Sequence, residues 1–169
     1  MRKQKGFSLI ELLIVVAIIL IIAAIAIPNL LRSRIAANEA SAVGSLRTIN
    51  TAEVTYASTY PSLGFAPALQ TLGPGATAGN TTAASNNAVL LDSVLGCSTG
   101  TSTTGCTKSG YTFILAGGTA VNGVVNTYAS NANPITVDQT GKRFFYSDAS
   151  GVIRYNATAT AASTDTPLQ

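Results

Sequence analysis

The sequence predicts an α+β protein in which a long N-terminal α-helix packs against a C-terminal antiparallel β-meander. Two observations lead to this fold class. An apolar run fills residues 9–27, and helix-spaced apolar residues extend it to about residue 58. Beyond a stretch rich in Pro and Gly, short β-prone runs alternate with turn signals as far as residue 156. The helix should be transmembrane in its first half and amphipathic in its second half.

The composition excludes several functional classes. The 169-residue chain contains no His and only 10% charged residues, so it lacks the most common general base and metal ligand. Three of its ten basic residues, Arg2, Lys3 and Lys5, lie at the N-terminus, and the other seven are balanced by seven acidic residues. The net charge of +3 therefore indicates a basic leader rather than a nucleic-acid-binding surface. We expect a protein that is not an enzyme and needs no cofactor.

The segment Leu9–Ile27 is long enough to cross a membrane. Its 19 residues are all apolar except Glu11. As a helix they would extend about 28 Å, close to the thickness of the hydrocarbon core of a bilayer. The basic residues before the segment predict that the N-terminus stays in the cytoplasm.

A secretory signal peptide is the alternative interpretation of this segment. Cleavage after Ala26 would fit the preference of signal peptidase for small residues, and it would leave a protein that starts at Ile27. Against this alternative, helical periodicity continues beyond Pro28. The stripe consists of Leu31, Ile35, Ala42, Leu46, Ile49, Ala52 or Glu53, Tyr56 and Tyr60. One helix of about 52 residues, from about Phe7 to about Ser58, would span roughly 78 Å.

Glu11 and Pro28 stand out within this helix. A carboxylate in a hydrocarbon segment is costly and calls for a partner, unless its side chain reaches the headgroups. Pro28 has no N–H to donate to the carbonyl of Ala24, so it predicts a bend or kink.

The residues Gly6-Phe7 followed by SLIELLIVVAIILIIAAIAIPNL resemble the N-terminus of the type IV pilins and of the related type II secretion pseudopilins. Gly6, Phe7, Glu11 and Pro28 match the family motif one by one, and the resemblance covers about residues 1–35. It implies that a prepilin peptidase cuts between Gly6 and Phe7 and methylates the new amine of Phe7.

The resemblance also implies a structural subunit of a type IV pilus. The subunit would wait in the lipid of the inner membrane, and an assembly platform with its ATPase would add it to a helical homo-oligomeric filament. There Glu11 would pair with the Phe7 amine of an adjacent subunit and set the register. The filament would serve adhesion, twitching motility or DNA uptake, so any nucleic-acid contact would belong to the filament.

Two other functions stay open. The chain could be a pseudopilin of a type II secretion system, although the acidic calcium-binding pattern of that group is missing. It could also be a secreted or membrane-anchored, non-catalytic binding domain.

These observations divide the chain into five parts. They are a cleaved leader (1–6), a transmembrane and filament-core helix (7–28), an amphipathic helix half (29–60), a globular head (61–157) and a flexible tail (158–169). Within the head we expect short helices at 66–72 and 88–95. The expected strands lie at 111–116, 124–130, 135–137, 142–147 and 152–156.

Cys97 and Cys106 are the two cysteines of the chain. In an exported protein an isolated pair predicts a disulfide, which would add about 2–3 kcal/mol of stability in the chain-entropy model. Their spacing fits no zinc or haem motif. Many type IV pilins have a disulfide near the C-terminus, whereas this pair precedes the first predicted strand.

Overall fold

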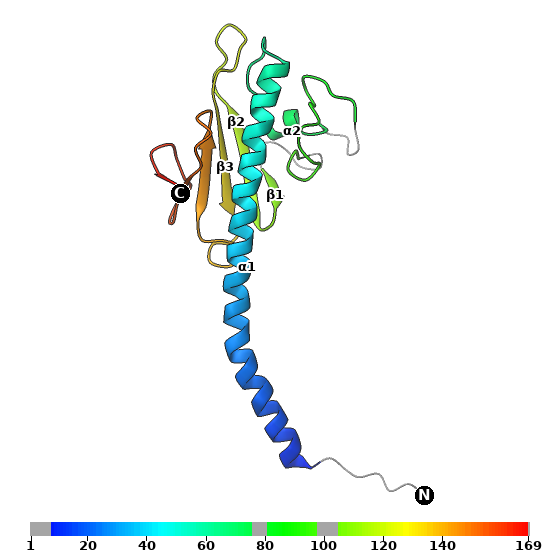
Figure 1. Ribbon diagram of the computed structural model, residues 1–169, viewed down its shortest axis with the longest axis vertical. Helices are drawn as coiled ribbons and strands as arrows, with labels where there is room; N and C mark the ends of the chain where they lie inside the picture. The colour runs from blue at the N-terminus through cyan, green and yellow to red at the C-terminus, as the bar shows by residue number, and fades with distance from the viewer. Residues whose placement is uncertain (1–7, 76–80, 98–104, 169) are drawn as a thin grey trace, which may run out of the picture. The chain divides into compact units, whose positions relative to one another are not determined.

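A long helix and one sheet make up the computed structural model, which describes residues 8–75, 81–97 and 105–168. The helix is α1 (Leu9–Thr59), followed by the short helix α2 (Leu69–Leu72) and six strands (Figure 1). The chain divides into two units between Arg34 and Ile35, although α1 itself is continuous. The predicted α+β fold class is confirmed.

The second half of α1 packs along the sheet, as Figure 1 shows. The residues of α1 that are buried there are Ile35, Glu39, Ala42, Val43, Ser45, Leu46, Ile49, Ala52, Glu53 and Tyr56. The predicted apolar stripe is therefore confirmed from Ile35 to Tyr56, whereas Leu31 is exposed and Tyr60 is half-buried. The sequence interpretation placed Glu39 outside the stripe. The structure buries it.

The sheet is an antiparallel meander in which every strand pairs with the next one in the chain. Its strands are β1 (Cys106–Lys108), β2 (Tyr111–Gly117), β3 (Tyr128–Pro134), β4 (Phe144–Asp148), β5 (Arg154–Asn156) and β6 (Thr166–Pro167). This topology confirms the meander that the sequence predicts.

Small residues on the middle of the sheet make room for the helix. On β3 the fully buried Ala132 pairs with Phe113 of β2 and with Phe145 of β4, which are also fully buried. Side chains on one face of a sheet alternate along each strand, so these three lie side by side on the core face. The alanine between two aromatic rings leaves space for α1 to approach.

The strand β3 begins later in the chain than predicted. Asn122 and Gly123 have positive φ values of 53° and 83° and form the two-residue turn between the paired Val121 and Val124. Such a turn fixes the register of a hairpin. Val124 therefore lies at the turn, and the strand ladder starts at Tyr128. The predicted strand 135–137 is wrong, because these residues belong to the connection between β3 and β4.

The helix predicted at 88–95 is absent. Instead the N–H groups of Ala88 and Leu90 donate to the carbonyls of Thr71 and Leu72, both at 2.7 Å. These long-range hydrogen bonds override the local helix propensity of the segment, in which Val89 has a positive φ of 55° and residues 93–97 form turns. Of the helix predicted at 66–72, only α2 forms.

The C-terminal residues return to the sheet, where the sequence predicts a flexible tail at 158–169. The strand β6 pairs with β5, and the Asn156 side chain donates to a carboxylate oxygen of Asp165 at 3.0 Å. Arg154 donates to the backbone carbonyl of Asp165 at 3.0 Å, and Leu168 packs against the core. The segment is held mainly by polar contacts. It has few apolar residues, so the sequence showed no strand pattern there.

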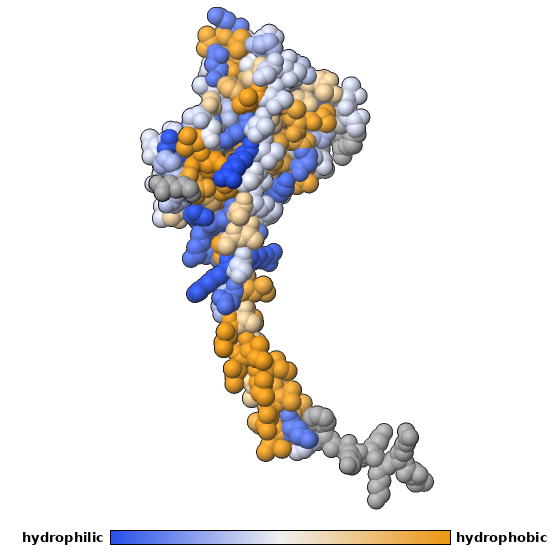
Figure 2. Space-filling model, in the orientation of Figure 1, coloured by the Kyte–Doolittle hydropathy of each residue, from blue (hydrophilic) through white to orange (hydrophobic). Residues whose placement is uncertain are grey.

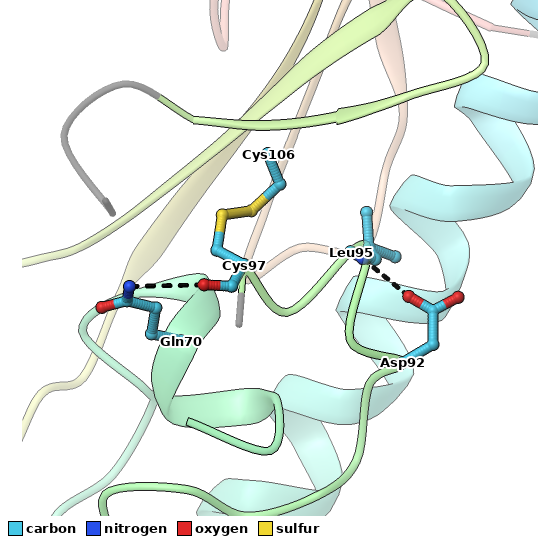
Figure 3. The surroundings of a disulfide bond; sticks show 5 residues. All are labelled: Gln70, Asp92, Leu95, Cys97 and Cys106. Carbon is cyan, nitrogen blue, oxygen red and sulfur yellow. Dashed lines mark hydrogen bonds between the residues drawn. A yellow bond between two sulfur atoms is a disulfide. The ribbon is translucent and has the colours of Figure 1, made fainter. Parts of the chain in front are cut away.

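The predicted disulfide between Cys97 and Cys106 forms (Figure 3). The two Cα atoms are 5.3 Å apart, and both side chains are buried. Cys106 is the first residue of β1, a strand that the sequence analysis missed, so the disulfide joins the sheet to the preceding turn. That turn is closed by Asp92, whose Oδ1 accepts the N–H of Leu95 at 2.6 Å, and Gln70 donates to the Cys97 carbonyl at 3.4 Å.

Replacing both cysteines by serine should lower the free energy of unfolding by about 2–3 kcal/mol, because the unfolded chain regains the freedom of a short loop. Denaturant unfolding of the full chain in detergent micelles, followed by tyrosine fluorescence, measures this. Reduction of the wild-type protein is the matched control and should give a similar loss. A loss below about 0.5 kcal/mol in both experiments would contradict the stabilising role.

Candidate functional site

An unpacked apolar surface covers the first half of α1. Every described residue from 8 to 34 is exposed except the half-buried Ala23. Figure 2 shows this part of the helix as an almost continuous hydrophobic surface. It contains a stretch long and apolar enough to cross a membrane, and the protein buries none of that stretch.

This surface needs a non-aqueous partner. Burying one Leu or Ile side chain is worth about 1.5–3 kcal/mol, and many such side chains are exposed here. Helices that are hydrophobic on all sides occur in membranes or inside larger assemblies. The arrangement therefore offers a surface for association with lipid or with other helices.

Glu11 lies in the first turn of α1 and caps the helix. Its Oε2 atom accepts the backbone N–H of Ser8 at 2.9 Å. Ser8 precedes the helix, and the pattern Ser-x-x-Glu is that of a capping box, in which the carboxylate satisfies an N–H at the helix start. Its negative charge also suits the positive end of the helix dipole. The sequence analysis gave Glu11 no local partner, although the Ser8–Glu11 spacing contained this signal.

Pro28 lies inside α1, and the helix runs through it without a break. The predicted helix kink at Pro28 stays a prediction. Gly6 and Phe7, where the sequence predicts leader cleavage and N-methylation, lie outside the described residues.

A second carboxylate, Glu39, clamps α1 to the connection between β3 and β4. Its Oε1 accepts the backbone N–H groups of Lys142 and Arg143 at 3.0 and 3.1 Å. Its Oε2 pairs with Nε of Arg143 at 2.8 Å. One residue earlier, the Asn38 side chain donates to the carbonyl of Thr140 at 2.8 Å. These contacts fix the helix where it enters the second unit.

The environment of Glu39 favours its charged form. Burial alone would raise the pKa of this carboxyl, but the Lys142 N–H and the two Arg143 donors outweigh burial and lower it. The Arg143 guanidinium also lies over the rings of Phe145 and Tyr155, 5.4 and 5.5 Å from their centroids. Sequence reasoning missed this clamp, because its partners are about a hundred residues apart.

Comparison with known proteins points to one family. The prokaryotic N-terminal methylation motif matches residues 1–27. The chain is 67% identical over 39 residues to the type IV wide pilus major component PilA4 of Thermus thermophilus, an alignment covering 23% of this chain and 30% of that protein. It is 40% identical over 72 residues to the type IV major pilin protein PilA of Myxococcus xanthus, covering 38% of this chain and 33% of that protein.

The similarity is confined to part of each protein. The chain spans about a third of the length of the curated relatives that it matches. No solved structure matches the chain. The predicted resemblance to type IV pilins is thus confirmed over the N-terminal part of the chain.

Replacing Glu39 by glutamine should destabilise the second unit at neutral pH by about 1.5–3 kcal/mol, the range for hydrogen bonds to a charged group. Because its pKa is lowered by folding, the charged Glu39 stabilises the protein above the pKa of the unfolded chain, and this contribution is lost as the pH falls through the folded pKa. Denaturant unfolding of both proteins between about pH 3 and pH 7 measures this.

Asp138→Asn is the matched control for Glu39→Gln. Asp138 belongs to the same connection and pairs with Lys142 at 3.4 Å, but both side chains are largely exposed. Its loss should cost less than about 1 kcal/mol. Equal effects of the two variants, or a Glu39→Gln difference that persists at the lowest pH, would contradict the clamp.

Proposed function

We propose that this chain is a non-catalytic structural subunit of a type IV pilus. One observation carries the proposal above the others. The N-terminal methylation motif lies directly on a helix whose apolar surface the protein leaves uncovered. The names of the two relatives, a wide pilus major component and a major pilin, support the same function.

The proposed life of the subunit begins in the inner membrane. The basic leader keeps the N-terminus in the cytoplasm, and the helix from Phe7 to Pro28 spans the bilayer. A prepilin peptidase removes residues 1–6 by cutting between Gly6 and Phe7, and it methylates the Phe7 amine. An assembly platform and its ATPase then transfer the subunit from lipid into an extracellular filament of identical subunits.

Glu11 is the proposed register element of the filament. The ammonium group of a neighbouring Phe7 would pair with this carboxylate in surroundings where few other polar groups are present. A carboxylate accepts several hydrogen bonds, so the contact with Ser8 does not prevent this pairing.

The mass of the native N-terminal peptide tests the processing pathway. A peptide that starts at Phe7 and carries one extra methyl group, about 14 Da, supports the prepilin pathway. A start at Ile27 would contradict it, because signal peptidase would then have removed the apolar segment. An uncleaved Met1 would also contradict it and would leave a simple membrane anchor.

Two substitutions separate the charge of Glu11 from its capping role. Glu11→Gln keeps an acceptor for the Ser8 N–H, as glutamine does in capping boxes, but removes the charge. We expect Glu11→Gln and Glu11→Leu to reach the membrane at wild-type levels and to reduce filament yield at least about tenfold, the effect of about 1.4 kcal/mol.

The filament yields of the two variants distinguish loss of the charge from loss of the helix cap. Filament yield is measured by shearing cells that express each variant and quantifying the subunit in the sheared fraction. Wild-type yield from Glu11→Gln with loss only in Glu11→Leu would mean that the cap matters and that charge pairing does not.

The alternative of a type II secretion pseudopilin shares this processing and the role of Glu11. Observation of long surface filaments from the wild-type gene favours a pilus. If the cells form no surface filaments and protein secretion depends on the gene, the result favours the pseudopilin.

A further inference from the structure

A hollow of about 620 Å³ lies at the ends of β2, β3 and β4. Four of its polar side chains are paired with one another: Tyr146 hydrogen-bonds to Asp148 and Ser163, and Asp148 hydrogen-bonds to Ser150. These four side chains therefore need no ligand to satisfy them. By contrast, the buried carboxyl group of Glu53 on α1 is only partly satisfied by hydrogen bonds.

Glu53 is a carboxyl group in the core of the second unit, and no described residue provides it with a counter-charge. Its side chain is 0% exposed. Its Oε2 accepts the backbone N–H of Ala66 at 2.8 Å, and its Oε1 has no hydrogen-bond partner among the described residues. The structure thus gives this group a single donor, whereas Glu39 has three.

The groups around Glu53 are neutral. Burial raises its pKa to about 7, against the opposing effect of the Ala66 N–H. The titratable neighbours are Tyr56 on α1 and Tyr128 on β3, which both interact electrostatically with it. Burial also raises the pKa of Tyr56, and that of Tyr128 to about 12, so both phenols stay protonated near neutral pH. The segment that contains Ala66 contributes only its backbone N–H.

The donor to Glu53 belongs to a segment that connects α1 with the hairpin whose turn is Asn122-Gly123. This segment, residues 61–67, follows α1. Its Phe65 N–H donates to the carbonyl of Val125 at 2.8 Å, and the Val125 N–H donates to the carbonyl of Leu63 at 2.8 Å. Phe65 also packs edge-on against Tyr128, with ring centroids 5.0 Å apart. Whatever holds Ala66 therefore also supports the pairing of the segment with the hairpin.

We propose that Glu53 is a proton-controlled latch that holds the segment 61–67 against α1. In its protonated form the carboxyl group stays in the core, and its oxygen accepts the Ala66 N–H. An ionised carboxylate with one donor and no cation is costly in an apolar core. On ionisation the side chain moves toward water, the contact with Ala66 breaks, and the pairing between Leu63 and Val125 opens.

Hydrogen exchange of the full chain in detergent micelles tests the latch. Exchange is followed by mass spectrometry at about pH 5.5 and about pH 8.5 and corrected for the intrinsic dependence of exchange on pH. We expect the protection of the Phe65, Ala66 and Val125 amides to fall by about 30-fold, the change that linkage gives for a pKa near 7 in the closed state. Amides of β4 in the same samples should keep their protection, which distinguishes local opening from global unfolding.

Glu53→Gln is the matched variant. Glutamine has nearly the same shape, remains neutral at both pH values and retains an acceptor for the Ala66 N–H. Its protection at 61–67 should be as high as that of the wild-type protein at low pH and should not change with pH. Wild-type protection that is independent of pH, or that changes equally in Glu53→Gln, overturns the proposal.

A second measurement needs only the wild-type protein, in case the variant does not fold. Titration of the glutamate side-chain carboxyls by ¹³C NMR should show one group with a midpoint near 7. Midpoints below about 5 for all glutamates, near their ordinary pKa, would overturn the latch. These readouts do not depend on filament formation, so the latch and the proposed pilus function can fail independently.

Discussion

A helix segment that is apolar on all sides must leave water, and this constraint governs the rest of the chain. The first half of α1 exposes nearly all of its side chains, so its partners lie outside the folded protein. Lipid tails and other apolar helices satisfy this need about equally well, because lipid is as apolar as leucine. The apolar side chains alone therefore do not decide between membrane and filament. In the function that we propose, the preference for the filament over the membrane has to come from Glu11, the polar group at the start of the segment.

The same helix carries three glutamates in three different surroundings. Glu11 caps the exposed N-terminus, Glu39 pairs with Arg143 at the edge of the second unit, and Glu53 is buried with one backbone donor. The number of donors decides which form of each buried carboxyl is favoured. Three donors, one of them the charged guanidinium of Arg143, lower the pKa of Glu39, whereas with a single donor burial dominates and raises the pKa of Glu53.

The sequence predicted the elements that depend on periodicity, and it failed where distant contacts decide. Helical spacing identified the face from Ile35 to Tyr56, and alternating runs identified the meander. A carboxylate on a buried face gives no signal of its own, because the partners of Glu39 lie about a hundred residues away. For the same reason the segment 88–95 was predicted as a helix, although hydrogen bonds to the carbonyls of Thr71 and Leu72 hold its first residues in a non-helical conformation. The turn at Asn122-Gly123 was a local signal that the sequence analysis overlooked.

The local cap at Glu11 and its proposed partner in the filament are compatible for a geometric reason. The Glu11 carboxylate accepts the N–H of Ser8 at the start of the helix, and Ser8 is the residue that follows Phe7, whose amine cleavage would free. A carboxylate has lone pairs for several donors, so accepting one N–H leaves acceptor capacity for an ammonium group. The cap also removes part of the rotational freedom of the side chain before any neighbour arrives, which lowers the entropic cost of forming an ion pair. A capped glutamate is therefore better prepared for intermolecular pairing than one that is free in the apolar segment.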